Sequence, residues 1–381
     1  MQTVRKLARI IAACAVLGIS MPALTAEAGI DKNGITVGQS AALTGPAAEL
    51  GTEMRLGAQL HFAEVNQKGG IFGRQIRLVT LDDGYEPDRA AANTRRLIGE
   101  VGAFALFGYV GTPTSNAALP IFTQAKIPFF GAFTGAESLR APFNRHIFNV
   151  RASYFDETEK IVEQLTSTGS RSIAVLYQDD AYGKAGLAGV ERALAGRKMK
   201  IAATATVARN TVDVGGAVKV LVPAQPDAIV MISAYTSIAA FVRAAKQAGY
   251  TGQFHNVSFV GSKALARELG ADGYGVAISQ VMPFPFSADT QLARDYQRAL
   301  KTIAGAQVSF TSFEGYIAAK VFVEGLRRAG RDLTRERFIS ALETMNNVDI
   351  GGYNIRFTPT SHNGSSYVDL TMIGRNGNFL K

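Results

Sequence analysis

The sequence FALFGYVGTPTSNAALPIFTQAKIPFFGAFTGAESL, residues 104–139, twice runs an apolar strand into a loop of small polar residues. The first strand is Phe104–Phe107, a helical run ends near Ala125, and the second strand is Pro128–Phe130. A strand, a helix and a second strand in this order predict a βαβ unit of a parallel sheet. The rest of the predicted fold extends from this unit on both sides.

The two loops of the unit are the first candidates for a functional site. Ligands of open α/β sheets bind beyond the carboxyl ends of the strands, where loop amides and hydroxyls face a crevice. Thr112 and Thr114 follow the first strand, and Ala132, Phe133 and Thr134 lie in the loop after the second. Threonine and glycine are also common in turns and helix caps, so for either loop alone both interpretations stand.

The same alternation continues on both sides of this unit. Before it, we expect strands Gly34–Ser40 and Ile76–Leu81, each followed by a helix. After it, we expect a second series of strands separated by helices: Ser172–Tyr177, Lys200–Thr206, Ala228–Ile232 and Gln253–Asn256. Alternation of this kind predicts parallel sheets covered by helices on both faces. Since 381 residues exceed the roughly 250–300 that one core holds, we expect two lobes.

The carboxyl-terminal part of the sequence predicts that the chain passes between the lobes again. Each proline of Met282-Pro-Phe-Pro-Phe restricts the backbone, so this stretch is interpreted as an extended inter-lobe connection. Three helices are then expected, followed by two strands that close the chain, Ile350–Phe357 and Tyr367–Ile373.

The amino-terminus predicts a secretory signal peptide over residues 1–28. Basic residues between Arg5 and Arg9 precede the apolar run Ile10–Leu24, and Ala26-Glu27-Ala28 matches an A-x-A cleavage site. The apolar run is shorter than the ~20 residues that span a bilayer. We therefore expect cleavage and export to the periplasm. Lipidation at Cys14 is the less favoured alternative, because Arg9 interrupts the apolar run before it.

Several kinds of chemistry lack candidates. The only cysteine falls in the signal peptide, and the four histidines are far apart and show no metal-ligand spacing. No G-x-S-x-G or G-x-x-x-x-G-K-[ST] motif occurs. The glycines of Gly183-Lys-Ala-Gly-Leu-Ala-Gly recur every third residue, which favours a closely packed helix start over a dinucleotide fingerprint. We therefore expect no cofactor, no metal and no enzymatic activity, although acid–base work by strand-end aspartates stays open.

The formal net charge is +9, but basic and acidic residues are interleaved along the chain. This pattern favours a solvated surface and not nucleic-acid binding.

Polar and aromatic residues on loops of both halves instead predict a small-molecule cleft between the lobes. Hydroxyl and backbone N–H groups at strand ends suit a carboxylate, while tyrosine and phenylalanine supply rigid walls. The candidate residues are Thr44, Asp83, Thr112, Thr114, Ala132, Phe133, Thr134, Tyr154, Asp180, Tyr182, Tyr235, Ser258 and Phe259.

Short motifs along the whole mature chain add a family resemblance. They are Ile35-Thr-Val-Gly with Leu43-Thr-Gly-Pro, Asn66-Gln-Lys-Gly-Gly-Ile-Phe-Gly-Arg-Gln-Ile, Leu81-Asp-Asp, Ile127-Pro-Phe-Phe, Asp180-Ala-Tyr-Gly and Phe313-Glu-Gly-Tyr-Ile-Ala-Ala. In this order the chain resembles the leucine/isoleucine/valine-binding proteins of branched-chain amino acid ABC transporters.

The resemblance implies a type I periplasmic binding fold with two Rossmann-like lobes joined by three crossings. The crossings are expected near Arg151, Val281 and Tyr353–Phe357. Lobe 1 would comprise residues 29–150 and 283–354, and lobe 2 residues 151–282 and 355–381.

The resemblance also implies roles for individual residues. Thr112 takes the place of the family's carboxylate-holding serine, and the loop with Phe133 and Thr134 that of its second carboxylate-binding loop. Tyr182 and Tyr235 match its second-lobe aromatic residues.

The chain departs from the family pattern at Ser258, where amino acid binders carry an acid for the ligand ammonium. Asp83, Asp180 or Glu314 would have to substitute, or the ligand is not an α-amino acid. We favour a small carboxylate without an ammonium group, and Phe133, Tyr154 and Phe259 leave an aromatic body open.

The expected function is therefore capture of a small carboxylate by a monomer that closes about its hinge and delivers the ligand to an inner-membrane ABC permease. A ligand-sensing receptor for a signalling partner is the alternative, and an exported hydrolase is a weaker one.

Overall fold

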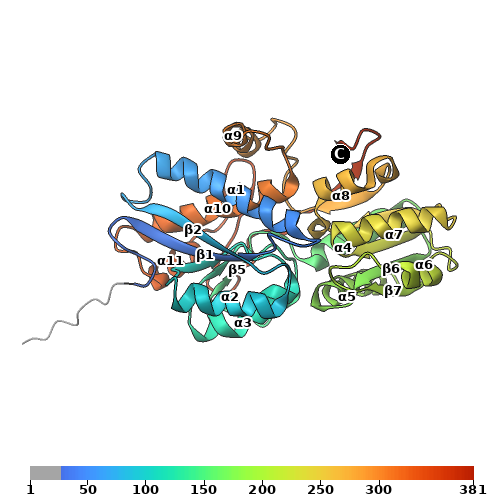
Figure 1. Cartoon of the computed structure of the whole chain (residues 1–381), viewed down its shortest axis with the longest axis horizontal. Coiled ribbons are helices and arrows are strands. Elements are labelled where there is room, and N and C mark those ends of the chain that lie inside the picture. Colours follow the sequence, from blue (N-terminus) through green and yellow to red (C-terminus); the bar gives the residue numbers. More distant parts are fainter. Residues whose placement is uncertain (1–26) are drawn as a thin grey trace, which may run out of the picture.

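Residues 27–381, which the computed structural model describes, form two lobes that each contain their own β-sheet (Figure 1). The predicted signal peptide, apart from Glu27 and Ala28, and the lipidation candidate Cys14 lie outside this range. Within it, no helix is both long and apolar enough to cross a bilayer.

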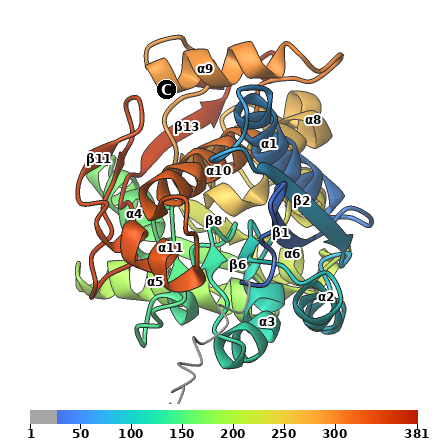
Figure 2. The same ribbon diagram turned by 90° about the vertical axis from the view of Figure 1, so that its left-hand side faces the viewer.

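The first lobe contains five parallel strands in the order β2-β1-β3-β4-β5. The strands are β1 (Gly34–Ala41), β2 (Gln75–Asp82), β3 (Ala105–Phe107), β4 (Phe129–Phe130) and β5 (Ile147–Phe148). Figure 2 shows the helices on the two faces of this sheet. One face carries α1 (Ala48–Gln67), α10 (Phe310–Ala329) and α11 (Arg335–Glu343), and the other α2 (Pro87–Gly99) and α3 (Thr112–Gln124).

The second lobe contains seven strands in the order β14-β13-β10-β9-β8-β6-β7. Strands β6 to β10 run parallel, whereas β13 and β14 pair antiparallel at one edge. The strands are β6 (Ile173–Gln178), β7 (Thr204–Val207), β8 (Ala228–Ile232), β9 (Gln253–Asn256), β10 (Ala277–Gln280), β13 (Asp369–Ile373) and β14 (Phe379–Leu380). The helices are α4 (Tyr154–Ser167), α5 (Ala181–Ala195), α6 (Gly215–Leu221), α7 (Tyr235–Gln247) and α8 (Ser262–Leu269).

Glycines allow two close helix packings. In the first lobe, a Cβ on Gly57 of α1 would lie 1.7 Å from the carbonyl oxygen of Ser312 in α10. In the second lobe, Cβ atoms on Gly183, Gly186 and Gly189 of α5 would meet Gln178, Ile232 and Thr158 within 2.7 Å. The interpretation of the glycine run as a closely packed helix start is confirmed.

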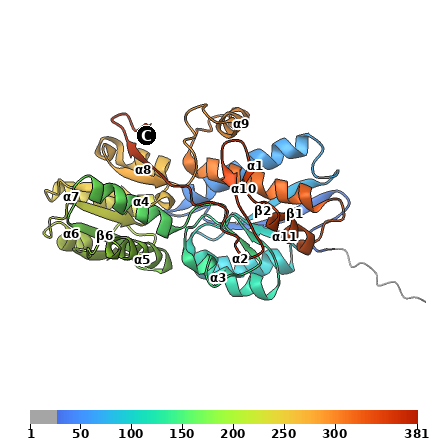
Figure 3. The same ribbon diagram turned by 180° about the vertical axis from the view of Figure 1, so that it is seen from behind.

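The chain passes between the lobes three times: between β5 and α4, between β10 and the segment that contains α9 (Gln291–Leu300) and α10, and between β12 (Asn354–Ile355) and β13. Figure 3, which shows the molecule from behind, shows the last crossing as the dark red segment that runs between the lobes. The hydroxyl of Tyr353, the residue just before β12, lies 3.1 Å from the carbonyl oxygen of Val150 and 3.2 Å from that of Val281, so it contacts the first two crossings. The predicted fold class is confirmed.

The strand predicted over Ile350–Phe357 is wrong. Only a short hairpin of β11 (Val348–Asp349) and β12 forms there. Asp349 accepts hydrogen bonds from the amides of Gly351 at 2.9 Å and Gly352 at 2.6 Å, and both glycines have positive φ. The side chain of Asp349 thus stabilises a tight turn inside the expected strand.

The chain still contacts the first lobe beyond this hairpin, because His362 Nδ1 lies 2.9 Å from the carbonyl oxygen of Ile147. The residue ranges predicted for the two lobes stay a prediction.

Candidate functional site

Three hydroxyl groups meet where β3 and β4 of the first lobe end. The hydroxyls of Thr112 and Thr134 share a hydrogen bond of 2.7 Å, and Thr134 Oγ1 also lies 3.2 Å from the hydroxyl of Tyr154. All three side chains are buried, and burial raises the pKa of Tyr154 to about 12. The cluster therefore presents neutral hydroxyls that can donate to an anionic oxygen.

Backbone geometry brings Thr112 to this position. Gly111 precedes α3 with φ +97°, a conformation that favours glycine, and a Cβ there would lie 2.2 Å from the Tyr85 ring. Thr112 is then the first residue of α3. The amino-terminus of a helix favours negative charge, which adds to the suitability of this corner for a carboxylate.

Aromatic rings from both lobes pack directly beside the hydroxyl cluster. The Phe259 ring of the second lobe lies 5.1 Å from Phe133, 5.9 Å from Tyr85 and 4.6 Å from Tyr182, centroid to centroid. Tyr154 lies 5.4 Å from Tyr182. The Tyr182 hydroxyl is buried and has no hydrogen-bond partner within residues 27–381. The two lobes thus contact each other through an apolar interface in which the Tyr182 hydroxyl is available to a ligand.

A buried ionic network adjoins these rings. The Arg151 guanidinium lies 5.3 Å from the centre of the Phe133 ring and 5.9 Å from that of Tyr154. It pairs with Glu157 at 2.8 Å and with Glu314 at 3.3 Å, and it donates to Ser258 Oγ. Burial raises the pKa of Glu314 to about 7. Ser258 therefore contacts a cation of the protein itself.

Ion pairs and hydrogen bonds join the lobes at the rim of this interface. Arg209 of the second lobe pairs with Glu86 of the first at 2.7 Å, and Arg267 pairs with Glu49 at 2.5 Å. Gln178 Nε2 lies 3.3 Å from the Tyr85 hydroxyl and links the centre to the rim. The lobes are in direct contact, as in a closed clamp.

The structure brings together seven of the predicted residues at the inter-lobe contact: Thr112, Phe133, Thr134, Tyr154, Tyr182, Ser258 and Phe259. Ala132 lies beside them, and its carbonyl oxygen accepts a hydrogen bond from the Thr134 amide at 2.9 Å. Tyr235 lies at the rim, where its hydroxyl accepts from the Glu49 amide at 3.4 Å.

Four predicted side chains form hydrogen bonds or ion pairs with neighbouring groups of the protein. Thr44 is exposed and donates to Asp82 at 2.6 Å, and Thr114 donates to backbone carbonyls of Val110 and Gly111. The remaining two are aspartates. Asp83 accepts from Ser40 and from the Tyr85 amide, while Asp180 caps α5 and pairs with Arg209.

Sequence reasoning missed two residues at the centre, Tyr85 and Arg151. Tyr85 follows Asp82-Asp83-Gly84 in a strand-end loop, a position that could have marked it. Arg151 was assigned only to a crossing. Its place as the single charge at the end of the extended run Ile147–Arg151 was the available signal, but that signal does not tell whether the side chain points inward.

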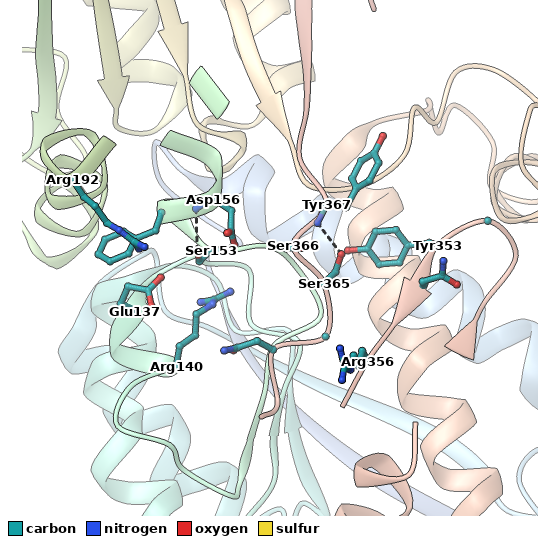
Figure 4. Close-up of a pocket in the computed structure, with 15 residues that line it drawn as sticks. Glu137, Arg140, Ser153, Asp156, Arg192, Tyr353, Arg356, Ser365, Ser366 and Tyr367 are labelled. Carbon is teal, nitrogen blue, oxygen red and sulfur yellow. Dashed lines mark hydrogen bonds between the residues drawn. The ribbon is translucent and has the colours of Figure 1, made fainter. Parts of the chain in front are cut away.

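A separate polar cavity of about 650 Å³ lies at the hinge (Figure 4). Arg140, Arg192 and Arg356 line it, together with Tyr353 and Tyr367 from the last part of the chain. None of the thirteen predicted ligand residues lines this cavity. Within residues 27–381, no group of three or more His, Cys, Asp or Glu side chains could hold a metal ion.

Known proteins with the same architecture identify the family. The model of the family described as periplasmic binding protein matches residues 34–378. A Leu/Ile/Val-binding protein homolog of Brucella melitensis is 26% identical over 365 residues, which covers 91% of each chain.

Two solved structures are similar over nearly their whole length. One is a possible leucine/isoleucine/valine-binding protein from Rhodopirellula baltica, with a TM-score of 0.88, 36% identity and coverage of 92% of this chain and 97% of that chain. The other is a substrate-binding periplasmic protein from Ralstonia solanacearum, with a TM-score of 0.86, 34% identity and coverage of 91% and 99%.

Members of this family bind small molecules and work with ABC transporters. With its two lobes, its sheet order and a family match that spans both lobes, the chain belongs to the periplasmic binding protein family.

Proposed function

We propose that this protein captures a small organic carboxylate between its lobes in the periplasm and delivers it to an ABC permease of the inner membrane. The observation that carries the proposal is the hydroxyl cluster of Thr112, Thr134 and Tyr154 at the strand ends, beside aromatic rings of both lobes. Hydroxyl donors and a helix amino-terminus bind a carboxylate, and the rings enclose an apolar or aromatic body.

The mechanism is closure about the hinge. The open form exposes Thr112 and Thr134 of the first lobe, the ligand carboxylate binds there, and the second lobe brings Tyr154, Tyr182 and Phe259 against the rest of the molecule. Rim contacts such as Arg209–Glu86 then stabilise the closed form. The closed surface is what a permease recognises. The protein acts as a monomer in this scheme and performs no chemistry on the ligand.

The experiment is a thermal-shift panel with the purified protein. The panel contains branched-chain amino acids, amides, aromatic acids, aliphatic carboxylates and dicarboxylates. A ligand at a hundredfold excess over its Kd adds about 2.7 kcal/mol to the free energy of unfolding, which raises Tm by several degrees. Calorimetry then gives the Kd. If no carboxylate raises Tm, the proposal fails, and sustained product formation would favour an enzyme instead.

A second experiment separates transport from sensing. Co-purification of the liganded protein with a permease supports the proposed delivery. Co-purification with a histidine kinase in place of a permease would favour the alternative function, a periplasmic ligand sensor.

A further inference from the structure

Arg151 lies within the first crossing and contacts both lobes. Its side chain is 1% exposed. Its guanidinium pairs with Glu314 of α10 in the first lobe and with Glu157 of α4 in the second. It also donates to Ser258, which is 107 residues away in the sequence. Arginine suits this place because its planar group can bond several acceptors at once.

Both glutamates already have polar partners within the protein. Glu157 Oε1 pairs with Arg151, while Glu157 Oε2 accepts from the Ser258 amide at 2.7 Å and from the Ser279 hydroxyl at 2.5 Å. Glu314 is buried, and Arg151 is its ion-pair partner. Both oxygens of Glu157 are therefore occupied, and a cation from outside would have to compete with Arg151 for Glu314.

The guanidinium also lies next to the rings that would enclose the ligand. The Arg151 carbon Cζ is 5.3 Å from the centre of Phe133 and 5.9 Å from that of Tyr154. Tyr154 contacts Thr134 of the hydroxyl cluster at 3.2 Å. A ligand whose carboxylate binds at Thr112 and Thr134 would thus place its α-substituent close to a buried positive charge.

One donor of Arg151 is still unused. Its Nε atom is buried and has no hydrogen-bond partner among the residues that the structure describes. A buried donor without a partner costs about 1–3 kcal/mol, so an acceptor that reaches it is favoured. A carbonyl or hydroxyl oxygen satisfies such a donor, whereas an ammonium group, which only donates, cannot.

From this arrangement we infer that Arg151 takes the place of a ligand ammonium, so that the site selects small carboxylates without an α-amino group, such as 2-oxo and 2-hydroxy acids. The inference rests on the proposed carboxylate capture and adds the residue that sets its specificity. The ammonium of an α-amino acid cannot accept from Arg151 Nε, and it would have to compete with Arg151 for the carboxylates of Glu157 and Glu314.

The test compares matched pairs of acids on the wild-type protein by calorimetry at pH 7. The pairs are 4-methyl-2-oxopentanoate against leucine and 3-phenyl-2-oxopropanoate against phenylalanine. Each pair keeps the carboxylate and the side chain and changes only the α-substituent. We expect the 2-oxo acid of at least one pair to bind more than about tenfold tighter than its amino acid, since one unmatched buried charge costs at least that much.

Two variants test whether Arg151 causes this preference. Arg151→Gln removes the charge and leaves Glu157 and Glu314 to pair with a ligand ammonium, so the preference should shrink or reverse. Arg151→Lys keeps a cation and should keep the preference. Circular dichroism and the Tm of each variant check folding. If Arg151→Gln does not fold, the affinities of the paired acids for the wild type and for Arg151→Lys decide whether the preference exists and follows the cation.

The possible results separate this inference from the proposed function. Equal or tighter binding of the amino acids by the wild type would overturn the inference and leave solute capture intact. A preference that persists in a folded Arg151→Gln variant would overturn the role of Arg151. If no acid of either kind binds, carboxylate capture itself fails, and the inference fails with it.

Discussion

Arg209 of the second lobe and Glu86 of the first are joined by an ion pair of 2.7 Å across the rim of the inter-lobe contact. Arg209 also forms an ion pair with Asp180 at 3.2 Å, and Asp180 caps the helix that contains Tyr182. The pair therefore connects the edge of the first lobe to the start of α5. It exists only when the lobes are together.

Arg209→Ala should weaken ligand binding through a faster dissociation rate. The two side chains are 22% and 42% exposed, so solvent screening limits the pair to about 1 kcal/mol or less, which is a change in Kd of up to about fivefold. Stopped-flow dissociation at low and high salt measures it, and the effect should decrease with salt. Lys160→Ala, which breaks a pair within α4, is the control. Identical dissociation rates for Arg209→Ala and wild type would contradict the prediction.

Thr112→Val should weaken carboxylate binding by about ten- to a hundredfold. The substitution keeps the shape and removes a hydroxyl that would donate to a charged oxygen, an interaction worth about 1.5–3 kcal/mol. Calorimetry with the tightest ligand of the panel measures the change.

The matched control is Thr94→Val. Thr94 is a buried threonine of α2 in the same lobe, and it bonds to Ala90 and Tyr109 away from the cleft. We expect it to lower Tm and leave Kd unchanged. If both variants bind as the wild type does, the role proposed for Thr112 is wrong.

Two neighbouring aspartates should change stability with pH in opposite directions. Burial raises the pKa of Asp83 from 3.8 to about 6. Burial alone would also raise the pKa of Asp82, but hydrogen bonds from Thr44 and from the Leu43 and Gly84 amides outweigh it and lower that pKa to about 2. The folded state thus binds a proton more tightly than the unfolded state at Asp83 and less tightly at Asp82.

For Asp83, the stabilising contribution is present below about pH 4 and is lost as the pH rises through about 6, by up to about 3 kcal/mol. Asp83→Asn should remove this loss. For Asp82, the contribution is present above about pH 4 and is lost as the pH falls toward 2, by about 2 kcal/mol. Urea unfolding of the wild type and of Asp83→Asn and Asp82→Asn across this range measures both. If the free energy of unfolding changes with pH in the same way for all three proteins, the pKa shifts assigned to Asp82 and Asp83 are wrong.

Gly57→Ala should destabilise the first lobe. The new Cβ would lie 1.7 Å from the Ser312 carbonyl oxygen, so α1 and α10 must move apart, and overpacking of this kind costs about 1–3 kcal/mol. Gly99→Ala in α2 is the control, since its Cβ would meet nothing within 4 Å and alanine favours the helix. Urea unfolding should show opposite signs for the two variants. Equal stability of both would mean that the helices are not in this close contact.

The fold could be predicted because its signals are local. The strand β1 and the helix that follows it are visible in the apolar pattern from Gly34 onward, and the crossing near Val281 follows from the proline-rich Met282–Phe286. The error at Ile350–Phe357 has a local cause as well. Two consecutive glycines, bonded by the side chain of Asp349, end the strand before it can form.

The site could be predicted only in part. Threonines and aromatic residues at strand ends were recognisable, because their place in a parallel sheet sends them toward one edge. The contact between Arg151 and Ser258 was not, since it depends on how two distant segments meet and on which way a single arginine points. The sequence shows that Ser258 lacks a charge, but it does not show that the protein supplies one of the opposite sign.

The hydroxyl of Tyr353 has a mechanical consequence. It lies within hydrogen-bond distance of one carbonyl oxygen on each of the first two crossings, Val150 and Val281, so the segment that leads into the third crossing meets the other two at one point. Sliding one lobe along the other would have to break these contacts, while rotation about the point keeps them. We therefore expect closure by rotation about this point, which would realign the same pairs of side chains each time.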